Sequence, residues 1–132
     1  MRIGELAERA GTRSKTLRFY ERAGLLPEPE RTASGYRDYD EGVLDRLSFV
    51  KAAQAAGLTL AEIRQVIAVR HDSGPPCAHV AALLEVHAVD LDARIAALEA
   101  TRAEVQRLRQ RASRLDPADC RPDGVCHVIP TR

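Results

Sequence analysis

Three cysteines are the residues of this sequence with the most distinctive chemistry. Cys120 and Cys126 lie in the segment DPADCRPDGVCHV near the end of the 132-residue chain, and Cys77 follows the run GPP. Thiolates are soft ligands that favour zinc, cadmium, lead or mercury over magnesium or calcium. Three cysteines cannot all pair within one chain, so we expect metal binding or thiol redox chemistry rather than a disulfide framework.

Two histidines lie close to these cysteines in the sequence. His127 adjoins Cys126, and His79 lies two residues after Cys77. Either imidazole has the chemistry to complete a tetrahedral zinc site, although both are also compatible with exposed histidines at the ends of a helix. The sequence therefore predicts a site of three thiolates and leaves a fourth ligand open.

The composition favours a helical, cytoplasmic protein. Charged residues make up 30% of the chain and aromatic residues 4%, with no Trp, which suits all-α structure with wet helix faces. No apolar run is long enough for export or for a membrane span, so we expect a cytoplasmic location and no membrane partner. The net charge is only +1, but Arg and Lys gather in residues 13–37, where a local basic surface can bind phosphates.

The first forty residues have the pattern of a winged helix-turn-helix. Apolar spacing predicts a two-turn helix that ends at Gly11, then a second helix from an N-cap at Ser14 to Gly24. In this plan the second helix enters the major groove of DNA. The segment SGYR predicts a tight turn and a short strand, which would form a wing beside that helix.

Three further helices are predicted after the wing. Asp40 and Thr59 are the expected N-caps of the third and fourth. From Ala78 to Leu115 there is no Gly or Pro, which predicts one helix of roughly 50 Å. The apolar positions repeat every seventh residue, at Leu84, Leu91, Leu98, Val105 and Ala112. This spacing is typical of a coiled coil, so we expect a homodimer.

The stretches IGELAERAG, TLRFYERAGLLPEPERTASGYRDYD and FVKAAQAAGLTLAEIRQVI resemble the MerR family of bacterial transcription regulators. The resemblance implies a dimer that binds a palindromic operator within an overlong promoter spacer. On binding its inducer, such a dimer bends and untwists the DNA so that RNA polymerase can use both promoter elements. This is indirect readout, in which binding energy deforms the duplex.

The same resemblance assigns DNA contacts to particular residues. On the second helix they are Lys15, Arg18 and Tyr20, and in the wing they are Arg31, Tyr36 and Arg37. Guanidinium and phenol groups are good donors to phosphate. For Tyr20 and Tyr39, packing in the core or the wing is an equal alternative, and Leu17 and Phe19 are assigned to the core.

The domain organisation follows from these elements. We expect a DNA-binding domain with connecting helices over residues 1–75, a dimerisation helix over 76–116 and a metal-binding loop over 117–132. Cys77 precedes the long helix and Cys120 follows it by about five residues, which reach only ~17 Å when extended. The three thiols of one chain therefore cannot easily meet. If two long helices pair antiparallel, Cys77 of one protomer meets Cys120 and Cys126 of its twin.

Other functions fit the sequence less well. An iron–sulfur sensor on this scaffold needs four cysteines close together, and this tail has two. A thiol enzyme is not expected, because there is no CxxC and no plausible pair of nucleophile and base. The resemblance favours a soft divalent ion, since copper sensors of the family lack a cysteine at the position of Cys77. A copper(I)-responsive or thiol-stress-responsive regulator remains the alternative.

Overall fold

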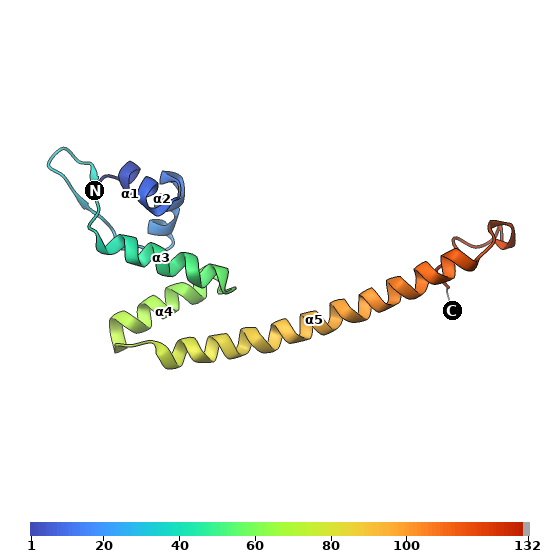
Figure 1. The fold of residues 1–132 in the computed structure, drawn as a ribbon. Coiled ribbons are helices and arrows are strands. Elements are labelled where there is room, and N and C mark those ends of the chain that lie inside the picture. Colours follow the sequence, from blue (N-terminus) through green and yellow to red (C-terminus); the bar gives the residue numbers. More distant parts are fainter. Residues whose placement is uncertain (131–132) are drawn as a thin grey trace. The chain divides into compact units, whose positions relative to one another are not determined.

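The computed structural model describes residues 1–130, and the chain divides into two compact units, Met1–His87 and Ala88–Arg132. The elements in chain order are α1 (Ile3–Ala10), α2 (Ser14–Arg22), β1 (Glu30–Arg31), β2 (Arg37–Asp38), α3 (Gly42–Ala55), α4 (Leu60–Ser73), α5 (Cys77–Arg114) and the short 3-10 helix η1 (Pro117–Asp119). Figure 1 shows these elements along the chain. The fold is all-α apart from one small antiparallel hairpin, as predicted.

The first unit is held together by one apolar core. Its fully buried side chains come from the first four helices and the loop after α2, and the largest are Leu6, Leu17, Leu25, Leu47, Val50 and Ile63. They recur at helical spacing within α3 and α4, so each helix turns one apolar stripe inward. Helices α1 and α2 likewise bury only their apolar sides, so their polar faces stay in solvent and are available for binding.

The turn between α1 and α2 is fixed from two sides. Gly11 ends α1 in the left-handed conformation at φ 64°, which costs a glycine little, and the amide of Thr12 donates to the carbonyl of Ala7 at 2.9 Å. From α3, Lys51 donates to the carbonyls of Ala10 and Gly11. These bonds satisfy the last carbonyls of α1 and set the direction in which α2 begins.

Two of the three predicted helix caps are wrong. Ser14 is already the first residue of α2, behind Arg13 at the N-cap, and Glu41 rather than Asp40 occupies the N-cap of α3. Neither observed N-cap residue makes a side-chain capping bond. The cap at Thr59 is confirmed. Its hydroxyl accepts the amide of Glu62 at 3.2 Å, and the Glu62 carboxylate accepts the amide of Thr59 at 2.9 Å.

Glu62 also joins α4 to the first turns of α5. Nε2 of His87 lies 2.9 Å and 3.1 Å from the two carboxylate oxygens of Glu62, and both side chains are about three-quarters covered. The hydrogen bond from the Thr59 backbone, and then the one to His87, hold the pKa of the Glu62 carboxyl below its ordinary 4.5. One carboxylate thus caps a helix and fastens the next helix to it.

Helix α5 has no buried residue within Cys77–Arg114. Several of its large apolar side chains are instead 45–70% exposed, namely Leu84, Leu91, Ile95, Leu98 and Val105. Such a row of apolar side chains is expected to be covered by another helix. None of the helices in residues 1–130 combines the length and the apolar composition that crossing a bilayer requires.

The lowered pKa of Glu62 predicts a pH dependence of stability. A depressed folded-state pKa contributes stability above about pH 4.5, and that contribution is lost as the pH falls through the lowered value. Glu62→Gln should therefore lower the melting temperature at neutral pH and flatten its dependence on pH below 4.5. Thermal unfolding at one protein concentration measures both effects. Glu85→Gln, at an exposed position of α5, is the control, and an equal flattening there would contradict the assignment.

Candidate functional site

The open face of α2 is basic. Successive residues of a helix are about 100° apart, so Lys15 and Arg22 point directly away from the buried pair Leu17 and Tyr20. Arg18 lies about 50° to one side of that direction. All three cationic side chains are exposed. The second helix of the helix-turn-helix therefore presents a cationic surface, as a helix that enters the major groove must.

Phe19 shares this face, and its predicted place in the core is wrong. Its side chain is 43% exposed, and it lies about 50° from the centre of the open face, on the side opposite Arg18. Leu17, two residues earlier, is fully buried as predicted. Leu17 and Phe19 are about 200° apart around the helix, so they cannot both point toward the core.

For Tyr20 the sequence left two roles open, DNA contact and packing, and its surroundings in the structure favour packing. Only 8% of the residue is exposed, and its hydroxyl donates to the side-chain oxygen of Gln54 on α3 at 3.2 Å. Tyr39 is buried likewise, at 4% exposure. Burial, and then the hydrogen bond to Glu21, raise the pKa of the Tyr39 hydroxyl well above its ordinary value. Both tyrosines anchor α2 and the wing to the core.

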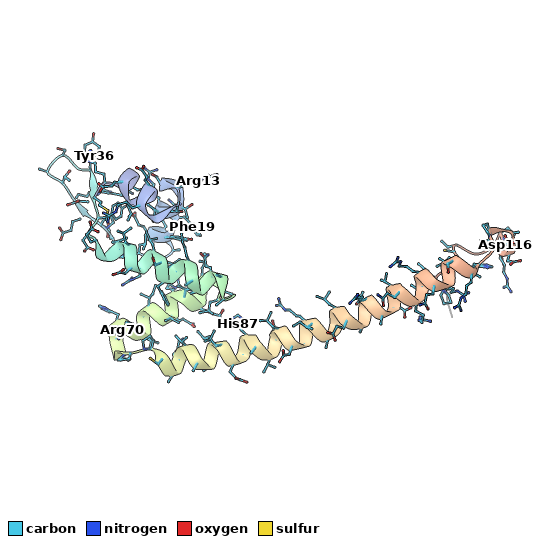
Figure 2. The ribbon with its side chains drawn as sticks, in the orientation of Figure 1. Arg13, Phe19, Tyr36, Arg70, His87 and Asp116 are labelled. Atoms are coloured by element: carbon cyan, nitrogen blue, oxygen red, sulfur yellow. The ribbon has the colours of Figure 1, made fainter. Side chains whose placement is uncertain are left out.

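The wing is a two-stranded hairpin in which Glu30 faces Asp38 and Arg31 faces Arg37. Its turn closes at Gly35, at φ 84°, and Arg31 donates to the carbonyl of Gly35 at 2.8 Å. Tyr36 is 55% exposed, and the guanidinium carbon of Arg2 lies 4.2 Å from the centre of its ring. The hairpin thus carries exposed Arg31 and Tyr36 on a closed turn, and Figure 2 labels Tyr36 there.

Glu21 links α2 to the wing, a role that the sequence reading missed. Its carboxylate accepts Nε of Arg37 at 3.2 Å and the hydroxyl of Tyr39, and only 12% of the side chain is exposed. Arg37 is therefore half-buried, with one of its five donors committed to this bond. The sequence does contain an indication of this role, because Glu21 is the only acidic residue in the basic stretch 9–27.

The thiol tail, residues 115–130, follows α5. Cys120, Cys126 and His127 line one hollow of about 190 Å³, and all three cysteines of the chain are free and exposed. Nε2 of His127 accepts the amide of Arg121 at 3.0 Å, and its carbonyl accepts Nε of Arg111 at 2.9 Å. His127 therefore closes the loop that carries both tail cysteines.

Cys77 is the first residue of α5 and belongs to the first unit, whereas the tail cysteines belong to the second. Near Cys77, the Nε2 atom of His79 is buried and has no hydrogen-bond partner among residues 1–130. Among residues 1–130 no three His, Cys, Asp or Glu side chains come close enough together to hold a metal ion. Neither unit by itself contains all three cysteines.

The basic helix, the exposed wing and the buried braces between them define a winged helix-turn-helix DNA-binding protein. The family description "MerR HTH family regulatory protein" matches residues 1–69, and "MerR, DNA binding" matches residues 44–108. The chain therefore belongs to the MerR family of transcriptional regulators, in its metal-sensing branch. Regulators of this family bind promoter DNA and act as dimers.

Individual relatives agree with this assignment. The chain is 34% identical over 120 residues to the HTH-type transcriptional regulator HmrR of Rhizobium leguminosarum bv. viciae, covering 91% of this chain and 92% of HmrR. It is 53% identical over 68 residues to a mercuric resistance operon regulatory protein of Bacillus cereus, and spans about half of that relative, 52%. The structure of PbrR691 from Ralstonia metallidurans CH34 with lead(II) aligns with a TM-score of 0.79 at 38% identity, over 91% of this chain and 94% of that one.

The bonds of Glu21 predict that its loss loosens the wing. Glu21→Ala removes the acceptor of both Arg37 and Tyr39, and hydrogen bonds to a charged group contribute about 2 kcal/mol. Because two such bonds are lost, we expect the free energy of unfolding to fall by about 2–4 kcal/mol. Hydrogen exchange at the wing amides should accelerate as well. Glu28→Ala, in the exposed segment before β1, is the control. Unchanged protection at Tyr36 and Arg37 would show that Glu21 does not hold the wing.

Proposed function

We propose that this protein is a metal-responsive repressor and activator whose dimer binds a palindromic operator in a promoter spacer and distorts the DNA when a soft divalent ion is bound. The observation that carries the metal assignment is that all three cysteines, Cys77, Cys120 and Cys126, are free and exposed. Zinc, cadmium, lead and mercury are the ions that such thiolates favour.

The DNA-binding half of the proposal rests on the charge of α2 and the wing. Lys15, Arg18 and Arg22 are exposed together on α2, and Arg31 and Tyr36 are exposed on the wing. Cations on a helix and on an adjacent hairpin can follow the groove and the flanking phosphates at once. Arg37 holds the wing through Glu21 and keeps further donors for phosphate. Tyr20 acts by fixing α2 on α3, not by contact with DNA.

The metal half of the proposal places each site between two protomers. Cys77 opens α5, and Cys120 and Cys126 follow its last residue, so a helix of 38 residues separates them along the chain. An antiparallel pair of such helices brings the start of one beside the end of the other, which is the arrangement that joins Cys77 to the partner's thiol tail. The exposed apolar side chains of α5 supply the surface on which the two helices would meet.

The two candidate histidines have different support as fourth ligands. His79 has a buried Nε2 without a hydrogen-bond partner, two residues from Cys77. His127 already uses Nε2 to accept the amide of Arg121. We therefore assign His127 to shaping the loop that presents Cys120 and Cys126, and His79 is the better candidate for a ligand.

The role of Arg18 predicts a loss of operator affinity. Removal of one guanidinium from a groove-facing helix costs roughly tenfold in affinity. Arg18→Ala should show this loss in titrations with the operator, while metal binding stays as in the wild type. Arg94→Ala is the matched control, because Arg94 is exposed on α5 and pairs with Asp90 at 2.9 Å. An unchanged operator affinity for Arg18→Ala would remove Arg18 from the DNA interface.

The proposed role of Cys77 predicts that its loss abolishes the response to metal but leaves DNA binding intact. Cys77→Ser should abolish transcription activated by the inducing metal and the charge-transfer absorbance of the bound thiolates. Operator binding should persist. A panel of zinc, cadmium, lead, mercury and copper identifies the ion. Val125→Ala, at a fully exposed position between the tail cysteines, should respond normally. Loss of operator binding in Cys77→Ser would make Cys77 structural, and a response to copper alone would favour the copper(I) alternative.

A further inference from the structure

We infer that the ring of Phe19 contacts the methyl group of a thymine in each operator half-site. Phe19 would thus contribute to the selectivity of the protein for the base sequence of the operator. This inference rests on the proposed operator binding by α2. It concerns the one large apolar side chain on the cationic face of that helix, and Figure 2 labels its place on α2.

The first observation is exposure in a charged setting. Phe19 is 43% exposed, and its neighbours on the open face of α2 are Lys15, Arg18 and Arg22. A phenyl ring gains nothing from phosphate, and it contributes binding energy only where apolar surface leaves water. The ring therefore needs an apolar partner within reach of a helix whose other exposed side chains are cations.

The second observation is that the ring is supported on one side. Its centroid lies 6.0 Å from that of Tyr20, with the two planes tilted by 48°. Tyr20 is itself buried and bonded to Gln54 on α3. The position of Phe19 is thus braced by the core, so ordering the ring on binding costs little entropy.

The chemistry of the major groove selects the partner. Guanine, cytosine and adenine present hydrogen-bonding atoms at their edges, and thymine adds the C5 methyl group. A side chain without donors or acceptors can read only that methyl group. Arg18 and Lys15 are suited to phosphate or to guanine, so the phenyl and the cations of α2 read different features.

The test uses duplexes that the wild-type protein selects from a randomised pool, with the thymines of both half-sites replaced pairwise by deoxyuridine. Wild-type protein should lose about fourfold in affinity per half-site at one position, as expected for one buried methyl group. Phe19→Ala should bind the thymine duplex more weakly and show no penalty for uracil at that position. Phe19→Leu, which keeps an apolar side chain, should retain part of the penalty.

Phe49→Ala is the matched control, because Phe49 is 38% exposed on α3 and should leave the uracil penalty unchanged. Circular dichroism and thermal unfolding verify that each variant is folded. A uracil penalty that is equal in wild type and Phe19→Ala at every position overturns the inference, as does a wild-type protein without any penalty. A transcription defect of Phe19→Ala without a change in affinity also overturns it. Failure of the wild type to select any duplex would refute operator binding itself.

Discussion

The structure depends on the exposed apolar surface of α5. Helix α5 has 38 residues and none of them is buried, whereas most helical stability in proteins comes from packing of an apolar face. Side chains such as Leu91 and Leu98 therefore require a second helix. Since regulators of the MerR family act as dimers, we propose that the partner helix belongs to a second copy of this chain. Its proposed antiparallel direction would bring the separated thiols together.

A small number of side-chain hydrogen bonds fix the DNA-binding elements of the first unit relative to one another. Lys51 sets the turn between α1 and α2, Tyr20 fixes α2 on α3, and Glu21 joins α2 to the wing. At the other end of the unit, Glu62 bonds His87 and so fastens α4 to the start of α5. In the proposed metal-dependent switch, this bond would be the contact through which a movement of α5 reaches α4.

The sequence was sufficient for the elements whose signals are local. Gly11, Thr59 and the GPP run gave the helix boundaries closely, and the heptad spacing predicted a helix with an uncovered face. The assignment of Phe19 to the core was wrong because it rested on the apolar type of the residue. Its angle on the helix places it opposite Leu17, away from the core. The caps predicted at Ser14 and Asp40 each missed the observed N-cap by one residue, which is within the precision with which a sequence locates a helix end.

Other features had no local signal to be found. The bond between Glu62 and His87 joins residues 25 positions apart, and the bond between Tyr20 and Gln54 joins residues 34 apart. The loop that His127 closes depends on backbone conformation in a segment rich in Pro and Gly. Sequence spacing predicts that one chain cannot assemble the three thiols, and this stays a prediction because Cys77 and the tail cysteines belong to different units.

Mixed dimers show whether each metal ion bridges two protomers. One protomer carries Cys77→Ser, the other carries Cys120→Ser with Cys126→Ser, and two affinity tags isolate the mixed species. Shared sites predict one intact site in the mixed dimer, hence half of the wild-type metal content, and none in either mutant homodimer. If the mixed dimer binds no metal while the wild type does, the thiols act within a single chain and the account is contradicted.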